Sequence, residues 1–242
     1  MTIFEKLSGR QGKKFAVLVD PDKLDTSGCH RLASLCSVAK VDFIFAGGSL
    51  VVTTRIDEMV TQLRSLTGLP VVLFPGNALQ VCGSADAILL LSLISGRNPD
   101  LLIGRHVEAA PMLRDSGLEI LPTGYMLVES GKMTTALYIS NTHPIPADKP
   151  DVAACTALAG ELLGLKLIYL DAGSGAMNPV APDMIRAVAD AVSMPVIVGG
   201  GIKTPQQATA ACKAGADVVV VGNAIEEDAE RITAFAHAIH QS

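Results

Sequence analysis

Val196-Ile197-Val198-Gly199-Gly200-Gly201-Ile202 is the stretch that decides the fold, and Val218-Val219-Val220-Val221-Gly222-Asn223 repeats its pattern further along the chain. Each begins as a run of β-branched residues that is too short for a helix, ends in glycine and precedes a helical pattern. Such runs are typical of buried parallel strands. An alternating series of strands and helices that closes on two glycine turns predicts a (β/α)8 TIM barrel, whose phosphate site commonly follows the seventh and eighth strands.

The composition agrees with one large domain. The chain has 242 residues, of which 49% are hydrophobic and 4% aromatic, with no Trp. Its core must therefore be built from Val, Ile, Leu and Ala, as barrel interiors are. No linker or low-complexity tract divides the sequence, so we expect a single domain over residues 1–242. The net charge of -5, without a cluster of Lys and Arg, argues against a nucleic-acid partner.

Several features predict a cytoplasmic protein. The longest apolar run, Ala87 to Ile94, is much shorter than the roughly 20 residues that cross a bilayer. The first fourteen residues contain several charges and no apolar signal core. The five cysteines are scattered and odd in number, which favours free thiols in a reducing compartment over disulfides or zinc.

The expected strands and helices alternate along the whole chain. The strands cover residues 15–19, 43–46, 71–74, 87–91, 119–128, 167–171, 196–199 and 218–221, and the helices cover residues 2–9, 25–38, 50–65, 100–116, 152–163, 182–191, 205–214 and 229–239. Only about a dozen residues separate the third and fourth strands, and they include Pro75, Gly76, Asn77 and Gly83. A full crossover needs at least that many, so the helix after the third strand is predicted to be reduced or missing.

The fifth strand carries an expected irregularity. Pro122 and Gly124 predict a break in it, and 136–139 is predicted as a second extended piece. The two would form a hairpin inserted at the end of the barrel where substrates bind.

Polar and glycine residues follow the strands. Asp20, Asp22, Ser49, Asp171 and the turns 173–175, 199–201 and 222–223 all lie at expected carboxyl ends of strands, which share one face of a barrel. Three glycine turns offer many backbone N–H donors and little bulk. This combination predicts a site for a phosphomonoester.

The carboxylates suggest further roles. Asp20 with the Ser49 hydroxyl suits Mg²⁺, which takes few protein ligands and keeps water or phosphate oxygens for the rest. Asp22 is interpreted as a helix cap. Asp171 is predicted to act as a general base or to anchor a substrate hydroxyl, with organisation of its own loop as the alternative. No lysine ends a strand, which disfavours Schiff-base aldolase chemistry.

The motifs together carry a resemblance that runs over essentially the whole chain. The sequence resembles the geranylgeranylglyceryl phosphate synthase family, which includes the bacterial PcrB-like prenyltransferases. The matching motifs are Asp20-Pro21-Asp22-Lys23, Gly47-Gly48-Ser49, Gly124-Tyr125, Ser140-Asn141-Thr142-His143-Pro144-Ile145-Pro146, Tyr169-Leu170-Asp171-Ala172-Gly173-Ser174-Gly175, Val198-Gly199-Gly200-Gly201-Ile202 and Val221-Gly222-Asn223-Ala224.

The resemblance implies a reaction. Members of the family transfer a prenyl chain, with Mg²⁺, from a polyprenyl diphosphate to the C3 hydroxyl of sn-glycerol 1-phosphate, and their barrel lacks the third helix. The family's usual Tyr-Leu-Glu is Tyr-Leu-Asp here, so the Asp171 carboxylate has one methylene less of reach. Leu18 stands where some relatives have Lys, which suggests the branch with the longer Ala-Gly-Ser-Gly loop.

The resemblance also implies site residues. Asp20 and Ser49 would bind Mg²⁺, and Asp171 would be the base or the hydroxyl anchor. The residues that would bind substrate are Tyr125, Tyr169, Leu170, Asp171, Ala172, Gly173, Ser174, Gly175, Gly200, Gly201, Gly222 and Asn223. The prenyl tail needs an apolar groove, for which Met126, Leu127, Met133 and Leu137 are candidates. The family resemblance further suggests a homo-oligomer, either a dimer or a hexamer.

Two other classes of function remain open at this point. One is another phosphate-binding barrel enzyme, such as a sugar-phosphate isomerase, which would ignore prenyl diphosphates. The other is a non-catalytic protein that binds a phosphorylated ligand, which would turn over no pair of substrates.

Overall fold

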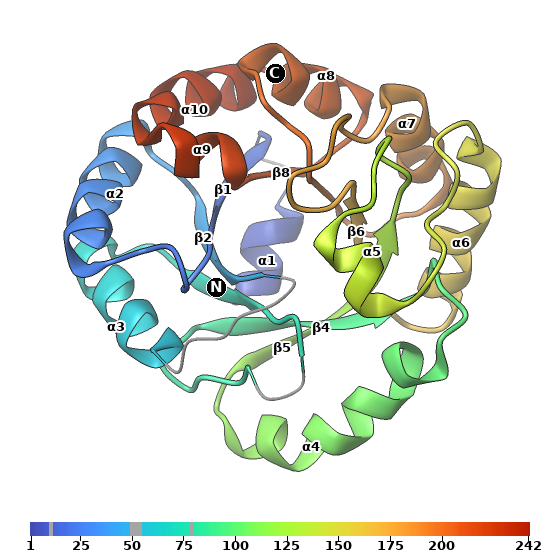
Figure 1. Ribbon diagram of the computed structural model, residues 1–242, viewed down its shortest axis with the longest axis horizontal. Helices are drawn as coiled ribbons and strands as arrows, with labels where there is room; N and C mark the ends of the chain where they lie inside the picture. The colour runs from blue at the N-terminus through green and yellow to red at the C-terminus, as the bar shows by residue number, and fades with distance from the viewer. Residues whose placement is uncertain (10–11, 49–54, 78–79) are drawn as a thin grey trace.

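Eight parallel strands close into a barrel in the computed structural model, which describes residues 1–9, 12–48, 55–77 and 80–242 (Figure 1). Each strand pairs with the next one in the sequence, and β8 pairs with β1. The strands are β1 (Lys14–Val19), β2 (Phe43–Gly47), β3 (Val71–Phe74), β4 (Ala87–Leu93), β5 (Glu119–Leu127), β6 (Leu167–Asp171), β7 (Val196–Gly199) and β8 (Val218–Val221). The predicted TIM barrel is therefore confirmed.

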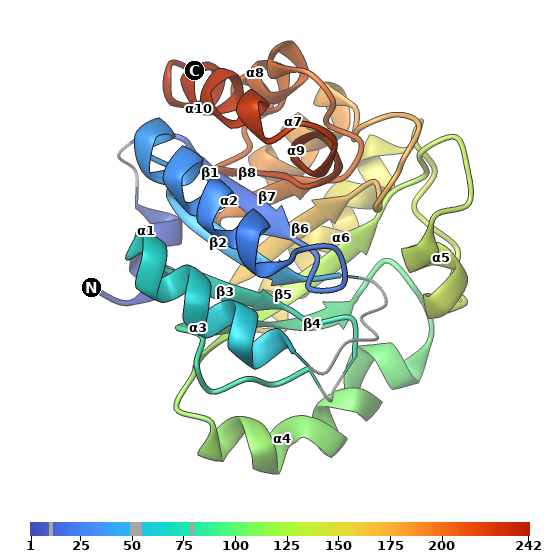
Figure 2. The ribbon, with the colours of Figure 1, turned by 60° about the vertical axis from the view of Figure 1, so that its left-hand side comes forward.

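Most of the helices form a ring around the strands, whereas α1 (Ile3–Ser8) and α5 (Thr135–Ser140) lie at opposite ends of the barrel (Figure 1 and Figure 2). The other helices are α2 (Thr26–Ala39), α3 (Ile56–Thr67), the π-helix η1 (Asp100–Gly104), α4 (Arg105–Asp115), α6 (Pro150–Leu162), α7 (Pro182–Ala191), α8 (Pro205–Ala214), α9 (Asn223–Glu227), the 3₁₀ helix η2 (Ala229–Arg231) and α10 (Ile232–His240). The N-cap of α2 is Asp25, whose carboxylate accepts the Gly28 N–H at 2.7 Å, so Asp22 does not cap that helix.

The ring is thinner between β3 and β4. Residues 75–86 connect these two strands, and the described part of this connection contains no helix. The expected absence of a helix after the third strand is thus confirmed for the described residues, since α3 precedes that strand. One side of the barrel wall there is covered by η1 and α4, and an apolar space remains beside them.

The prediction of a broken fifth strand followed by a hairpin was wrong. β5 is continuous, because Pro122 lacks only one N–H and its carbonyl still accepts the Lys166 N–H at 2.8 Å. Residues 136–139 belong to the helix α5, which Thr134 caps by accepting the Leu137 N–H. Burial in this segment follows a helical rather than a strand period, with 136, 137 and 140 buried and 138 and 139 exposed.

The core has two layers because successive strand residues point to opposite sides. In β8, Val218 and Val220 fill the barrel interior, whereas Val219 and Val221 pack between the strands and the helices. Ile3 and Leu7 of α1 join the interior cluster and close one end of the barrel. Figure 2 shows α1 at the opposite end of the barrel from α5. The open end therefore lies on the α5 side, where the strands finish.

Two smaller expectations concern cysteines and membrane spans. All five cysteines are free, as predicted, and four of them are buried. Among the described residues, no helix is both long and apolar enough to pass through a bilayer.

Candidate active site

A polar cavity of about 570 Å³ opens at the carboxyl ends of the strands. The glycine turns after β6, β7 and β8 contribute to its lining, and Asp20 after β1 faces them. Among the described residues, the charged side chains of the lining are Lys23, Lys132, Lys203, Asp20, Asp171, Glu226 and Glu227. Three lysines do not outweigh four carboxylates, so a strongly anionic ligand needs backbone donors or a cation in addition.

The floor of this cavity is aromatic. The rings of Phe74 and Tyr169 stack with centroids 5.0 Å apart, and Tyr125 meets both rings edge-on, at 5.8 Å from Phe74 and 5.7 Å from Tyr169. The register of β5 against β6 brings Tyr125 beside Tyr169. Phe74 and Tyr169 belong to the lining of this cavity, and Tyr125 packs against both rings without being part of that lining.

Asp171 ends β6 and is only 6% exposed. Its Oδ2 accepts a hydrogen bond from the Tyr125 hydroxyl at 2.6 Å, and its Oδ1 accepts one from the Gly173 N–H at 2.6 Å. Burial raises the pKa of the Asp171 carboxyl, while these two hydrogen bonds act in the opposite direction. A carboxylate has about four acceptor positions, so Asp171 can still accept the proton of a ligand hydroxyl.

The glycine turns are packed too closely for larger residues. Gly200 has φ +76°, and a Cβ there would meet the Asp171 carboxylate and the Gly173 N. Gly173 has φ +89°, and a Cβ there would lie 2.6 Å from Thr134 Oγ1. Both positions require the left-handed conformation, which glycine adopts without steric strain. These turns therefore bring bare backbone to the wall of the cavity.

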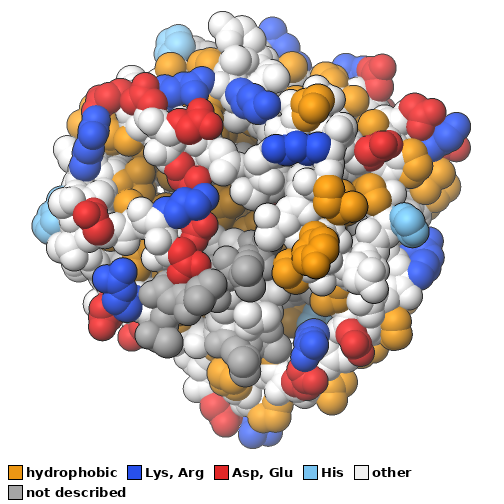
Figure 3. Space-filling view, viewed as in Figure 1, with side chains coloured by type: hydrophobic (Ala, Val, Ile, Leu, Met, Phe, Trp, Pro, Cys, Tyr) orange, Lys and Arg blue, Asp and Glu red, His pale blue; other side chains and the backbone are white. Residues whose placement is uncertain are grey.

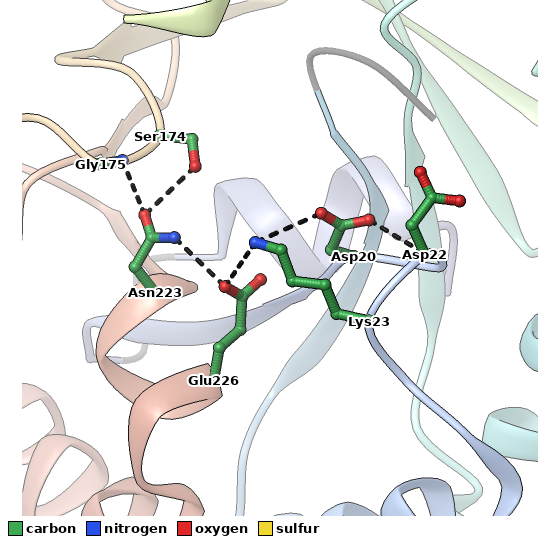
Figure 4. A network of polar contacts seen from close by, with 7 residues as sticks. All are labelled: Asp20, Asp22, Lys23, Ser174, Gly175, Asn223 and Glu226. Carbon is green, nitrogen blue, oxygen red and sulfur yellow. Dashed lines mark hydrogen bonds and ion pairs between the residues drawn. The ribbon is translucent and has the colours of Figure 1, made fainter. Parts of the chain in front are cut away.

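A network of polar side chains joins the β6 turn to the β1 turn (Figure 4). Asn223 Oδ1 accepts the Gly175 N–H at 2.8 Å and the Ser174 hydroxyl at 3.3 Å, and its Nδ2 donates to Glu226 Oε2 at 3.2 Å. The same Glu226 oxygen accepts from Lys23 Nζ at 2.9 Å.

Lys23 continues the network to Asp20, with Nζ 3.5 Å from Asp20 Oδ2. The hydrogen bond to Glu226 raises the pKa of Lys23, with smaller contributions from Asp20, so the side chain stays an ammonium. The two turns are consequently joined by one unbroken series of contacts.

The proposed metal ligand Asp20 suits Mg²⁺. Its side chain is 21% exposed and lines the cavity, and Oδ1 accepts the Asp22 N–H at 3.0 Å. No group of three His, Cys, Asp or Glu side chains that could hold a metal occurs in the part of the chain that the structure describes. Mg²⁺ often binds through only one or two carboxylates plus substrate phosphates, so a single carboxylate fits. Ser49, the second predicted ligand, lies outside the described residues.

A second, apolar cavity of about 440 Å³ adjoins the first. The two cavities share Gly48 and Phe74 in their linings. The apolar cavity lies among β4, β5, α4 and α5, and its described lining includes Leu90, Leu93, Leu101, Ala109, Leu113, Leu127, Ala136 and Ile139. In Figure 3, acidic and basic side chains alternate over the rim near β1 and α9, whereas hydrophobic ones gather nearer α5.

Most residues expected at the site meet at this rim. The polar cavity is lined by Asp20, Tyr169, Asp171, Ser174, Gly175, Gly200, Gly201, Gly222 and Asn223, and Tyr125 and Gly173 contact Asp171. The side chains of Leu170 and Ala172 instead pack in the layer between strands and helices, which leaves only their backbone near the rim.

The expected apolar groove is only partly made of the predicted residues. Leu127 lines the apolar cavity, but Met126 points to the helix layer because it alternates with Leu127 along β5. Leu137 packs in a small cluster with Leu127, and Met133 is 71% exposed.

The site residues predicted from the sequence do not include Lys23, Phe74 or Glu226. Phe74 is the last residue of β3, so the rule that strand ends share one face could have found it. Glu226 lies three residues after Asn223, a spacing that is informative only once α9 is known to be a helix.

The closed barrel, with a polar and an apolar cavity at the carboxyl ends of its strands, has the architecture of a (β/α)8-barrel enzyme. Comparison with known proteins makes this class specific. A sequence model of the PcrB family matches residues 10–239. The chain belongs to the PcrB family, and it is an enzyme of the prenyltransferase class.

Individual relatives agree with this assignment. The chain is 57% identical to the geranylgeranylglyceryl phosphate synthase of Spirosoma linguale, over 100% of this chain and 97% of the relative. It is 56% identical to that of Chitinophaga pinensis, over 94% and 90%. Among solved structures, (S)-3-O-geranylgeranylglyceryl phosphate synthase from Thermoplasma acidophilum in complex with its substrate sn-glycerol-1-phosphate superposes with a TM-score of 0.94 at 34% identity, with both chains covered completely.

Proposed function

We propose that the enzyme joins a polyprenyl chain, geranylgeranyl, from its diphosphate to the C3 hydroxyl of sn-glycerol 1-phosphate in a Mg²⁺-dependent reaction. The observation that carries this proposal is the meeting of two unlike cavities at Gly48 and Phe74. A polar cavity with glycine turns suits a small phosphate ester, and an apolar cavity beside it suits a long hydrocarbon. A sugar-phosphate isomerase would have no use for the second cavity.

The glycerol phosphate would bind in the polar cavity. Its phosphate would accept hydrogen bonds from backbone N–H groups of the turns at 173–175, 200–201 and 222–223. Tyr169 lines this cavity and would pack against the glycerol carbons, whereas Tyr125 would act through its hydrogen bond to Asp171. The C3 hydroxyl would then lie toward Asp171.

Bond making and bond breaking need few protein groups. The C3 oxygen forms the ether bond to C1 of the prenyl chain as the bond from C1 to the diphosphate oxygen breaks, and the hydroxyl proton passes to the Asp171 carboxylate. Burial makes this carboxylate a stronger base than an exposed one. Asp20 would hold Mg²⁺, with Ser49 as second ligand, and the bound cation would stabilise the departing diphosphate.

The apolar walls would exclude water from the reacting carbon. Leu93, Leu127 and Ile139 lie on the α5 side of the apolar cavity, where the prenyl chain would pass. An allylic cation captured by water would give a free prenyl alcohol, so dry walls favour ether formation over hydrolysis.

A labelled-product assay tests the proposed reaction. Labelled sn-glycerol 1-phosphate with geranylgeranyl diphosphate should give an organic-extractable product with Mg²⁺ and none after chelation. The enantiomer, sn-glycerol 3-phosphate, serves as the matched substrate control and should react much more slowly. Absence of product under all conditions, or turnover of a sugar phosphate alone, would reject the proposal.

The proposed assembly is a homo-oligomer, a dimer or a hexamer. Ile103 and Val107 on one side of η1 and α4 are 60% and 67% exposed, and Leu162 and Leu163 at the end of α6 are 80% and 81% exposed. Apolar side chains that share a surface are often covered by another subunit. Light scattering after gel filtration should give a multiple of the 25.2 kDa chain mass, and a monomer mass would contradict the assembly.

A further inference from the structure

We propose that Lys23 binds the diphosphate group and that Glu226 couples this contact to the glycerol-phosphate turn, so that the two substrates bind cooperatively. This inference rests on the proposed function and assigns roles to Lys23 and Glu226, two residues to which the proposed function gives none. It follows from the network that joins the β1 turn to the β6 turn (Figure 4).

Lys23 lies where a diphosphate needs a cation. Its ammonium is 3.5 Å from Asp20 Oδ2, beside the expected Mg²⁺ ligand, and its side chain is 53% exposed and lines the cavity. Lys132 and Lys203, the other described lysines of the lining, belong to the β5–α5 and β7–α8 connections, whereas Lys23 shares the β1 turn with Asp20. Lys23 is thus the described lysine that adjoins the metal ligand.

Glu226 holds this lysine in place. Its Oε2 accepts from Lys23 Nζ at 2.9 Å, the shorter of the two contacts that the ammonium makes. The same oxygen accepts from Asn223 Nδ2 at 3.2 Å. One carboxylate oxygen therefore fixes a cation on one side and an amide on the other.

Asn223 links Glu226 to the turn at 173–175, which is the proposed phosphate-binding turn. Its Oδ1 accepts the Gly175 N–H at 2.8 Å, which fixes the position of the turn at 173–175. Because Glu226 orients the Asn223 amide, the position of this turn depends on the same carboxylate as the position of Lys23.

Cooperative binding follows from this shared constraint. Lys23, Glu226 and Asn223 are already linked without ligand, and a substrate bound at either end restricts their remaining motion, so the second substrate meets a site with less motion left to lose. Coupling is reciprocal, which means that each ligand must change the affinity of the other by the same factor.

Equilibrium titration measures the coupling without turnover. The ligands are sn-glycerol 1-phosphate and inorganic pyrophosphate, at one fixed Mg²⁺ concentration, and each dissociation constant is measured with and without the other ligand at saturation. In the unmodified enzyme, saturation with either ligand should lower the dissociation constant of the other by about fivefold or more. Lys23→Met should raise the dissociation constant of pyrophosphate by about tenfold and leave that of sn-glycerol 1-phosphate, measured without pyrophosphate, nearly unchanged.

Two neighbouring glutamates provide a matched comparison. Glu226→Ala should reduce the coupling factor to near one, and Glu226→Gln, which keeps a single acceptor oxygen, should retain part of it. Glu227→Ala removes the same charge from the next residue, which also lines the cavity, and should keep the coupling. Because the readout is a ratio of affinities in one variant, a general loss of affinity does not imitate the result.

The possible outcomes separate this inference from the proposed function. If both ligands bind the unmodified enzyme without affecting each other, the coupling is refuted while the proposed function stands. Coupling that survives Glu226→Ala and Glu226→Gln, or that disappears equally in Glu227→Ala, also refutes it. If neither ligand binds the unmodified enzyme, the proposed function fails together with the inference.

Discussion

Tyr125→Phe should shift the pH dependence of the enzyme by about one unit. The substitution removes the hydroxyl that donates to Asp171 Oδ2 at 2.6 Å and keeps the ring that packs against Phe74 and Tyr169. That hydrogen bond stabilises the ionised carboxylate, so its loss raises the pKa of Asp171 beyond the increase that burial causes. A hydrogen bond to a charged group is worth about 1.5–3 kcal/mol, and one pKa unit corresponds to about 1.4 kcal/mol.

The sign of the shift follows from the role of the base. Asp171 accepts a proton only when it is ionised, so activity falls as the pH drops through its pKa. With the pKa raised, the acidic limb of kcat/KM should move to higher pH. We expect about one unit rather than two, because the remaining donor, the Gly173 N–H, still stabilises the carboxylate.

The assay is a pH profile of kcat/KM for labelled sn-glycerol 1-phosphate at saturating geranylgeranyl diphosphate. Tyr169→Phe is the control, because it removes a hydroxyl from the same cluster and leaves the hydrogen bond between Tyr125 and Asp171 in place. An acidic limb that stays put or moves to lower pH in Tyr125→Phe would refute the reasoning. An equal shift in both variants would refute it as well.

Three other substitutions test the site and the fold. Asp20→Asn should lower Mg²⁺-dependent turnover by about a hundredfold or more, while the dissociation constant of sn-glycerol 1-phosphate, measured by calorimetry, stays within about twofold. The control Asp22→Asn keeps the backbone N–H that donates to Asp20 and should retain activity. Gly200→Ala should lower the free energy of unfolding in urea by about 3 kcal/mol, through backbone strain and contact with Asp171. Gly164 also has a positive φ, +90°, but open space around it, so Gly164→Ala should lower it by only about 1 kcal/mol. Equal losses would show that contact with the site does not matter. Ala109→Phe should fill part of the apolar cavity and raise the KM of geranylgeranyl diphosphate about tenfold while the KM of sn-glycerol 1-phosphate stays the same, and an unchanged KM for the diphosphate would place the prenyl chain elsewhere.

The barrel could be predicted because its signals are local. Short β-branched runs such as 196–198 and 218–221 cannot form helices, and the glycines after them mark where each strand ends. The absence of a helix after the third strand could be predicted because that connection has only the minimum length of a crossover and contains Pro75, Gly76, Asn77 and Gly83. Segment 136–139 misled the reasoning because four apolar or aromatic residues in a row fit a buried strand equally well, and the cap at Thr134 decides in favour of a helix.

The candidate site could be predicted in its backbone but not in its side-chain contacts. The rule for strand ends brought Asp20, Asp171 and the glycine turns together. The hydrogen bond from Tyr125 to Asp171 joins residues 46 positions apart, and it depends on the register that sets Leu127 beside Asp171. Likewise, the contact between Lys23 and Glu226 spans 203 positions and requires the closure of β8 onto β1. Such contacts depend on three-dimensional register, which sequence spacing does not encode.

The central claim is that backbone amides of the glycine turns bind the phosphate of sn-glycerol 1-phosphate and that Asp171 receives its C3 hydroxyl. A crystal structure of the enzyme soaked with this ligand tests the claim most directly. The account predicts the phosphate beside Gly173, Gly200 and Gly222, with the C3 hydroxyl at hydrogen-bonding distance from the Asp171 carboxylate. A phosphate bound away from these turns, or a C3 hydroxyl that points away from Asp171, would contradict it.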